Sequence, residues 1–531
     1  MKLTNTFKKS DYLFNKKIKN FASYFIGAII VIICFLLFKE SKSGDAAIYF
    51  VYFKNFFNLP FSFQKSIVSF GATSPIHVIV FSFIYQLTGK FWLISLKFFN
   101  FLLFYLGVIL LIKTFSITDS NKRNSNIDIL LTVFFFSIIN LTFLESLGQI
   151  FETGLIYFCI SLIYYLLKNK NITGSIFTAG SLNLVRPELV LITLSIFIYL
   201  FLISENKKSI LIKIIISLIP SIIYYLYMYI NTGYIIPSSI YGRMVFASEF
   251  SSNWFNKVYN LFPFLSSLKR SLTYILGILS IIYLSVKKKN IKIEMVLTLP
   301  IIFFYLIFPP GSYITRYWIP LLPIFSVLIY LLINEFINSK KLIGIELLGI
   351  FIVLSGYGYL YSKGLLSKYN YDNILLYDLA KEFNKILDKS DNILLYEIQG
   401  QYYISGNCYS MDGIVGNQII DVIKGEMKFE DFLRKYNIKY VVNHSNIRGR
   451  EIFLRTALSE LYYHDINSNI GDSIVINNIV YTKILTNPEF ENPKNFFISK
   501  DEISGRNIRT YYENTFWNSV YRIKPKVVIE K

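Results

Sequence analysis

The chain has 531 residues, of which 53% are hydrophobic, 18% aromatic and only 17% charged, whereas a soluble domain usually carries about a quarter charged residues. Its formal net charge of +20 would suit a nucleic-acid-binding protein, but the basic residues sit in short loops between apolar runs, which is the pattern that specifies membrane topology. The three cysteines, Cys34, Cys159 and Cys408, form no disulfide framework or zinc-site spacing.

Apolar runs of about the length that crosses a roughly 30 Å hydrocarbon layer fill the first two thirds of the chain. The first run, 21–38, follows a cluster of lysines and lacks the small-residue cleavage site of a secretory signal. Lysines before a span hold the amino terminus in the cytoplasm, so we expect Asp45 on the outer face. Later basic loops are expected in the cytoplasm, and they hold Lys113, Lys122, Arg123, Lys168, Lys170, Lys207, Lys208, Lys287, Lys288, Lys289, Lys340 and Lys341.

Two apolar runs, 75–87 and 91–112, separate the outer Asp45 from the cytoplasmic Lys122. Two full crossings would return the chain to the outside, so one of these runs must not cross. The run 75–87 is the shorter, and we expect it to form a re-entrant or surface-lying helix while 91–112 crosses inward.

The remaining apolar runs alternate across the membrane without conflict, at 128–145, 153–167, 172–185, 189–204, 210–230, 271–286, 293–308, 318–334 and 342–361. The runs on either side of Asn171 and Arg186 are short for full crossings, and tilted or broken helices would account for them. The pattern predicts a polytopic α-helical membrane protein, with about 11 transmembrane helices and one re-entrant or juxtamembrane helix within 1–362.

The remaining segment, 363–531, has an ordinary charge content. Strand-like runs at 392–397 and 439–443 alternate there with helical stretches at 372–387 and 429–436. We therefore expect a small extracytoplasmic α/β domain after the last span. No internal repeat is obvious, which disfavours an inverted-repeat transporter.

Two acidic residues are expected at the outer membrane surface. Asp45 lies a few residues beyond the first span, where a carboxylate could take the proton from an attacking hydroxyl; a solvated loop acid is the simpler interpretation. Glu152 lies where an apolar run re-enters the membrane, and acids near apolar spans are usually paired or functional. A helix N-cap acid would explain Glu152 equally well.

Three arginines share that face. Arg186 and Glu188 flank Pro187 between two apolar segments, and they form either a structural salt bridge or part of a site for an anionic ligand. Arg243 and Arg316 run against the positive-inside trend. Arginine suits forked contacts with phosphate oxygens, although each arginine taken singly could simply contact lipid head groups.

Six short segments stand in order along the chain, at 44–49, 71–75, 150–153, 184–188, 237–243 and 316–323. In this order they resemble motifs of the GT-C superfamily of integral-membrane glycosyltransferases, in particular the bacterial arabinofuranosyltransferase-like branch and its polyprenyl-phosphate-sugar-dependent, family 39-like relatives. The segment 150–153 resembles Gly-Met-Glu-Thr, and 237–243 matches its motif loosely. The second acid of the first motif is replaced by Ala46, and Arg243 stands where lysine is common.

This resemblance implies an inverting glycosyltransferase that moves a sugar from a polyprenyl-phosphate carrier to a glycolipid, polysaccharide or protein acceptor on the outer face of the bacterial cytoplasmic membrane. It implies that Asp45 is the general base, with Glu152 as a second catalytic residue. Arg243, Arg316 and Arg186 would hold the departing phosphate. The residues expected to orient the substrate are Glu188, Thr73, Ser74, His77 and Tyr317.

Two other classes stay open: a lipid-linked saccharide flippase or transporter, and a non-catalytic envelope assembly factor. The loss of the second acid at Ala46 is compatible with the assembly factor. No cofactor or metal site is assigned, and a divalent cation is neither indicated nor excluded. His77 is more often a packed interfacial histidine than a ligand. The expected partners are the lipid-linked donor, the lipid-linked or surface glycan acceptor and membrane lipids, without nucleic acid.

Overall fold

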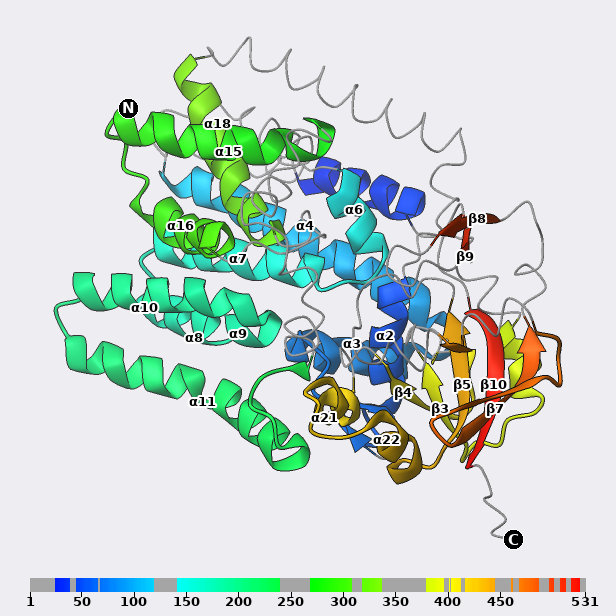
Figure 1. Cartoon of the computed structure of the whole chain (residues 1–531). Coiled ribbons are helices and arrows are strands. Elements are labelled where there is room, and N and C mark those ends of the chain that lie inside the picture. Colours follow the sequence, from blue (N-terminus) through cyan, green and yellow to red (C-terminus); the bar gives the residue numbers. More distant parts are fainter. Residues whose placement is uncertain are drawn as a thin grey trace, which may run out of the picture.

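The computed structural model describes residues 24–38, 44–64, 67–118, 141–238, 268–307, 318–336, 379–395, 401, 403–411, 416–444, 460–461, 468–486, 496–500, 507–511 and 517–525. Its helices up to residue 336 pack side by side, and the strands of the C-terminal third form a sheet at one end of them (Figure 1). The predicted boundary at 362 and the apolar run 342–361 lie outside the described residues.

The first described helix is Tyr24–Phe38. The next helix begins at Gly44, so Asp45 belongs to a first helical turn rather than to a loop. A small β-hairpin that the sequence did not predict separates this helix from the next. The elements in order are α2 (Gly44–Asn55), β1 (Ser62–Gln64), β2 (Ile67–Val68), α3 (Pro75–Thr88), η1 (Gly89–Phe91) and α4 (Trp92–Thr118).

The predicted re-entrant segment corresponds to α3, whose 14 residues span only about 21 Å at 1.5 Å per residue. The single turn η1 joins it to α4, and together Pro75–Phe115 form an apolar helical stretch of 41 residues. The length of α3 agrees with a helix too short for a full crossing; whether it crosses stays a prediction.

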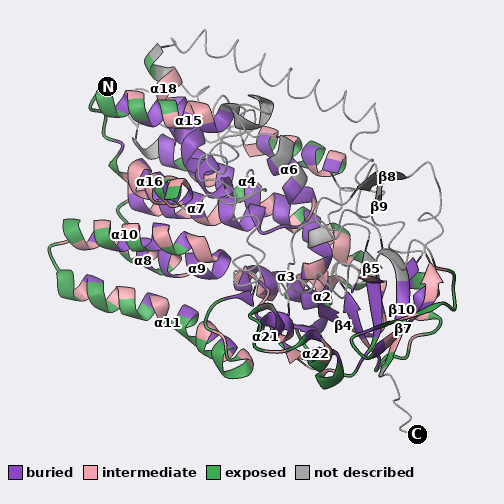
Figure 2. Cartoon of the chain, in the orientation of Figure 1, coloured by how far each residue is buried: buried purple, intermediate pink, exposed green. Residues whose placement is uncertain are grey.

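The central helices are α6 (Leu141–Gly148), α7 (Thr153–Lys168), α8 (Ile172–Gly180), α9 (Leu182–Val185), η2 (Pro187–Leu189), α10 (Val190–Ile203) and α11 (Lys207–Thr232). The apolar run 172–185 is broken at Ser181 into α8 and α9. Large apolar side chains of α11, such as Ile219 and Ile223, are exposed, as expected for a helix whose surroundings are lipid. Figure 2 shows exposed and half-buried residues along much of α11.

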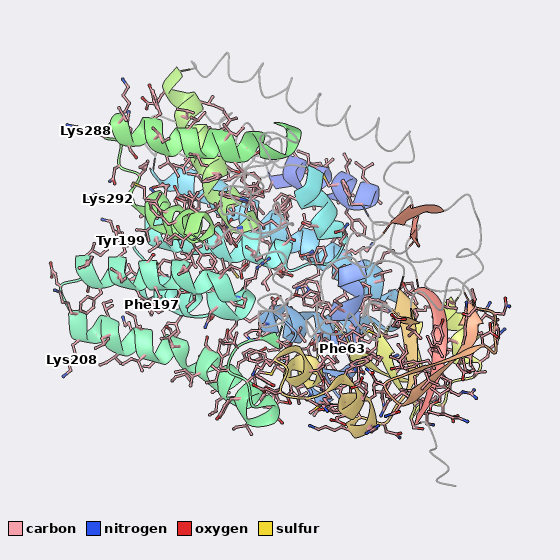
Figure 3. The ribbon with its side chains drawn as sticks, in the orientation of Figure 1. Phe63, Phe197, Tyr199, Lys208, Lys288 and Lys292 are labelled. Carbon is pink, nitrogen blue, oxygen red and sulfur yellow. The ribbon has the colours of Figure 1, made fainter. Side chains whose placement is uncertain are left out.

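Three further helices complete the helical part: α15 (Leu268–Val286), α16 (Lys292–Ile307) and, after the turn η4 (Ile319–Leu321), α18 (Leu322–Phe336). Figure 3 shows Lys208, Lys288 and Lys292 at the end of the helices remote from the sheet. This arrangement agrees with the expectation that these loops share one side of the membrane, opposite the C-terminal domain.

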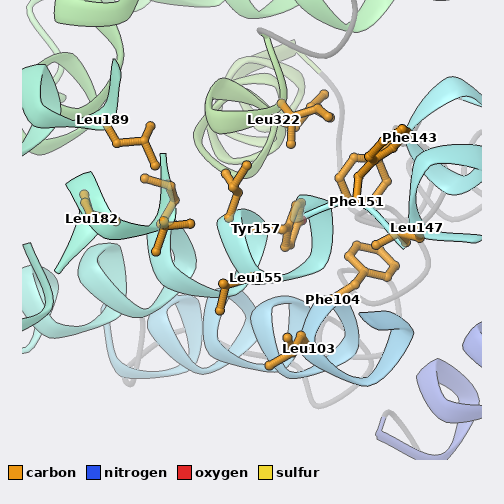
Figure 4. Packing of buried hydrophobic residues seen from close by; sticks show 14 of the residues in the cluster. Leu103, Phe104, Phe143, Leu147, Phe151, Leu155, Tyr157, Leu182, Leu189 and Leu322 are labelled. Atoms are coloured by element: carbon orange, nitrogen blue, oxygen red, sulfur yellow. The ribbon is translucent and has the colours of Figure 1, made fainter. Parts of the chain in front are cut away.

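The core of the helical part lies between α4 and α7, where the rings of Phe104, Phe143 and Tyr157 meet edge to face (Figure 4). A Cβ at Gly107 would lie 2.7 Å from Tyr157 Cδ1, and one at Gly154 only 2.2 Å from Asn100 O. Glycine at these positions lets the two helices approach closely, as small residues do between helices in membranes.

The C-terminal part contains a six-stranded sheet in the order β4-β3-β5-β10-β7-β6. Strands β3, β4 and β5 are parallel, and the rest pair antiparallel. The predicted strands at 392–397 and 439–443 and the helix at 429–436 are confirmed. The elements are β3 (Asn392–Leu395), β4 (Asn407–Ser410), η7 (Asn417–Ile419), α21 (Ile420–Ile423), α22 (Phe429–Lys435), β5 (Ile438–His444), β6 (Ser473–Ile476), β7 (Ile479–Thr486), β10 (Trp517–Pro525) and a separate hairpin of β8 (Phe496–Lys500) and β9 (Asn507–Tyr511).

Candidate active site

The candidate site is centred on Arg186, which lies between α9 and η2. Pro187 begins η2, and it holds Arg186 in an extended conformation with φ −157° because a residue before proline avoids the helical region. The Arg186 side chain is buried, Nη1 donates to Glu152 Oε1 at 3.1 Å, and Nη2 pairs with Glu188 Oε1. One guanidinium fork therefore holds two carboxylates.

Glu152 is presented by a tight turn at the start of α7. It occupies the N-cap position but makes no side-chain cap hydrogen bond; instead Oε1 accepts from Arg186 and Oε2 from the hydroxyl of Tyr49, at 3.3 Å. The structure thus favours the paired acid over the N-cap alternative for Glu152.

The turn before Glu152 is strained. Ile150 has a φ of 61°, and a β-branched residue in the left-handed region is an outlier; the resembled motif has glycine at this position, where the conformation is free of that cost. Asn100 of α4 fixes the turn: its Nδ2 donates to Leu147 O at 3.0 Å and Phe151 O at 2.9 Å, and its Oδ1 accepts from Gly154 N at 3.1 Å. Strain held in this way is typical of functional sites.

Tyr49 connects two more motifs to the same point. Its hydroxyl lies 3.2 Å from Thr73 Oγ1 as well as within reach of Glu152. The ring of His77 stands edge-on to Tyr49, with centroids 5.0 Å apart, and packs on Phe81, which agrees with a packed histidine. Ser74 is buried immediately before α3.

Asp45 lies one turn before Tyr49 in α2, so the two positions share a helix face; the Asp45 side chain lies outside the described part of the structure. The predicted Arg243, Arg316 and Tyr317 also lie outside the described residues. Their expected roles therefore stay predictions.

The described end of the last motif does approach the cluster. Trp318 is buried and packs against Tyr305 of α16, with ring centroids 6.1 Å apart, and Tyr305 lies in the electrostatic surroundings of Arg186. Segments from five of the six motifs, at Tyr49, Thr73, Glu152, Arg186 and Trp318, thus lie in or next to one cluster.

The cluster carries one cation and two anions, which leaves a net negative charge of one among Arg186, Glu152 and Glu188. Burial by itself lowers the pKa of Arg186, but Glu188 and Glu152 raise that pKa well above its ordinary value, so the guanidinium is always charged. Both terminal nitrogens of Arg186 contact carboxylates, and its expected contact with the donor phosphate stays a prediction. In this geometry Arg186 organises the two acids.

Sequence reasoning missed Tyr49, Asn100 and Tyr305 as members of this centre. Asn100 gave a usable signal, because a polar amide in an otherwise apolar span must find partners. Tyr49 ends the first motif, but aromatic residues are too frequent in this chain to single it out. Among the residues that the structure describes, no group of three or more His, Cys, Asp or Glu side chains could hold a metal ion.

No protein-family model and no curated protein matches this sequence. The crystal structure of ArnT from Cupriavidus metallidurans bound to undecaprenyl phosphate, however, aligns with a TM-score of 0.55 at 10% identity, over 94% of this chain and 97% of that chain. The chain has a GT-C fold. The arabinofuranosyltransferase AftD from Mycobacteria aligns at 13% identity with a TM-score of 0.42, over 93% of this chain and 39% of that chain.

The GT-C fold confirms the expected architecture at the level of a predominantly helical membrane protein with a sheet-containing part. Within the described residues, two helical stretches, Pro75–Phe115 and Lys207–Thr232, are long and apolar enough to cross a membrane unaided, and several shorter apolar helices accompany them. The expected count of about 11 crossings and their orientation stay predictions.

Proposed function

We propose that this protein is an inverting glycosyltransferase that moves a sugar from a polyprenyl-phosphate carrier to a cell-envelope acceptor on the outer face of the bacterial cytoplasmic membrane. One observation carries the proposal. In a chain with the fold of ArnT, a protein bound to undecaprenyl phosphate, Tyr49, Thr73, Glu152, Arg186 and Glu188 meet at one charged, buried point.

The reaction is a single displacement. The acceptor hydroxyl attacks the anomeric carbon from the face opposite the carrier, a new carbon–oxygen bond forms, and the bond from the anomeric carbon to the phosphate oxygen breaks. Polyprenyl phosphate leaves with the electron pair of that bond, and the hydroxyl proton passes to the carboxylate of Asp45. A base is needed because an acceptor hydroxyl has a very high pKa and must lose its proton as it attacks.

The charged centre orients this chemistry. Glu152 and Glu188 are fixed by Arg186, and Glu152 connects through Tyr49 to the helix that carries Asp45, one turn away. In this proposal Arg243 and Arg316 bind the donor phosphate and stabilise the charge that grows as it departs. Thr73, Ser74, His77 and Tyr317 orient the sugar, with Thr73 held through the Tyr49 hydroxyl.

The test is glycosyl transfer by purified protein in liposomes, with a panel of polyprenyl-phosphate sugars as donors and extracted surface glycolipids as acceptors. We expect Asp45→Asn to lower the rate about 10²- to 10⁴-fold, the usual contribution of a general base. Asp431→Asn is the matched control, because Asp431 is an exposed acid of α22 whose contact is to Arg434 at 3.7 Å.

Equal rates for wild type and Asp45→Asn would contradict the assignment of the base. A scaffold or a transporter would tolerate Asp45→Asn and would release no polyprenyl phosphate from any donor. Release of polyprenyl phosphate is therefore measured beside sugar transfer in the same samples.

A further inference from the structure

The C-terminal part contacts the loops that build the proposed active centre. Figure 1 shows α21 beside the carboxy-terminal end of α11, and β3 and β4 near α2. Hydrogen bonds join described residues of the two parts at Tyr234 and at Gln401. The Tyr234 hydroxyl donates to Asp421 Oδ1 at 3.0 Å, and Gln401 Nε2 donates to Phe63 O at 2.7 Å.

The Gln401 contact reaches the helix of the proposed base through one shared carbonyl. Phe63 O also accepts from Asn55 Nδ2 at 3.2 Å, and Asn55 is the last residue of α2. Both Gln401 and Phe63 are buried. The C-terminal part and α2 therefore bind the same carbonyl oxygen of the β1–β2 hairpin.

The Tyr234 contact reaches the same region by a second route. Tyr234 follows Gly233, which ends α11 with a φ of 74°, and the Nζ of Lys424 lies 5.5 Å from the centre of the Tyr234 ring. Four residues later, Ser238 N donates to Phe70 O at 2.9 Å. Phe70 precedes the 71–75 motif, whose Thr73 contacts Tyr49.

We infer that the C-terminal part positions the proposed active centre, with Gln401, Tyr234 and Asp421 as positioning residues that act through the hairpin and the 71–75 motif. Two carbonyl oxygens before Thr73 accept these contacts. Phe63 O accepts from Gln401, and Phe70 O accepts from Ser238 N, four residues after the Tyr234 that binds Asp421. Releasing either contact loosens Thr73 and with it Tyr49 and Glu152. The predicted effect on donor turnover rests on the proposed function; the predicted loosening does not.

The experiment uses the full-length protein with Gln401→Met, Tyr234→Phe and the double variant. Methionine keeps the length of glutamine, and Gln401 Oε1 accepts no hydrogen bond within the described residues, so Gln401→Met removes one contact. Tyr229→Phe is the matched control, because Tyr229 is a half-exposed tyrosine of α11, with Asp431→Asn as a control on the C-terminal side.

Two readouts are taken. Hydrogen exchange of peptides covering 61–70 and 234–238 reports the loosening, because the amides of Ser69 and Ser238 donate to Phe61 O and Phe70 O. Binding of undecaprenyl phosphate reports its effect on the centre. We expect exchange to quicken and the Kd to rise about five- to tenfold in the double variant, as for one or two lost hydrogen bonds, with the melting temperature and the controls unchanged.

Three results would contradict the inference. Unchanged exchange and unchanged binding would show that the contacts position nothing. Faster exchange with unchanged binding would show that the contacts only hold the C-terminal part against the helices. Weaker binding without faster exchange would show that the variants do not act through the hairpin and the 71–75 motif. Where transfer is measured, a positioning role raises the donor KM and leaves kcat within about twofold. Faster exchange and weaker binding in a protein that transfers no sugar would support the inference and contradict the proposed glycosyltransferase function.

Discussion

Charged clusters lie at both ends of α7, and the two clusters differ. At one end Glu294, in the first turn of α16, accepts from the Tyr164 hydroxyl at 2.7 Å and pairs with Lys168 of α7 at 2.8 Å. At the other end Glu152, just before α7, pairs with Arg186 at 3.1 Å.

The first cluster is neutral and local. One cation meets one anion, and all three side chains belong to the two helices that they join. The second cluster holds two anions on one cation, and Tyr49 and Thr73 connect it to α2 and to the 71–75 motif. Charged networks can be purely structural. The excess charge and the convergence of separate motifs are the reasons why we propose the second cluster as the site.

The largest effect is expected at Arg186. Arg186→Met leaves Glu152 and Glu188 buried without their cation, and removing one partner of a buried ion pair costs about 3–5 kcal/mol. We therefore expect both a clear drop in the melting temperature and the loss of transfer. Arg186→Lys keeps the charge but not the fork, so it should fall between wild type and Arg186→Met in both measurements. A melting temperature equal to that of wild type in Arg186→Met would contradict the buried centre.

Glu294→Gln should separate the two clusters most clearly. Its partner Lys168 is 22% exposed and can turn toward solvent, so we expect a smaller loss of stability, about 2 kcal/mol, with transfer within about twofold of wild type at a temperature where the variant is folded. Thermal unfolding and transfer are measured on the same preparation. If Glu294→Gln kept its stability but lost transfer, the site would lie at the Glu294 end of the helices, which would contradict the proposed assignment.

Tyr49→Phe tests whether the centre works as a connected network. It removes the hydroxyl that bonds Glu152 and Thr73, and a hydrogen bond to a charged group is worth about 1.5–3 kcal/mol. We expect transfer to fall about 10- to 100-fold with little change in the melting temperature. Tyr229→Phe serves as the control, and equal rates in the two variants would remove Tyr49 from the centre.

The smallest effect is expected at Lys289 and Glu335, an exposed pair at 2.8 Å. Exposed ion pairs contribute about 0–1 kcal/mol and are screened by salt. Glu335→Gln should therefore change neither transfer nor the melting temperature measurably, in low salt or in high salt. A large effect on transfer would show that an exposed ion pair remote from the proposed site contributes to activity, which contradicts this prediction.

The sequence predicted much of this arrangement and missed its connections. Periodicity located many of the helices and the strands β3 and β5, because these follow from neighbours in the chain. The contact of Tyr49 with Glu152 joins residues 103 positions apart, and nothing local encodes it. The left-handed Ile150 contradicts its own propensity, so only the bonds of Asn100 to the surrounding turn explain it.

The β1–β2 hairpin was missed for a related reason. Its strands have three and two residues, too few to show an alternating pattern, and its geometry depends on Asn55 and Gln401, which bond Phe63 O from different parts of the chain. Short elements held by long-range contacts are the ones that sequence patterns do not reveal.

We propose that the cluster around Glu152 belongs to the catalytic site and that the cluster around Glu294 is structural. The most direct measurement compares Glu152→Gln with Glu294→Gln in the liposome transfer assay, with the melting temperature of each variant determined alongside. We predict that Glu152→Gln loses transfer about 100-fold, as expected when the reacting groups are no longer held in position, while Glu294→Gln transfers like wild type. Full transfer by Glu152→Gln, or the loss of transfer in both variants in proportion to their stability, would contradict it.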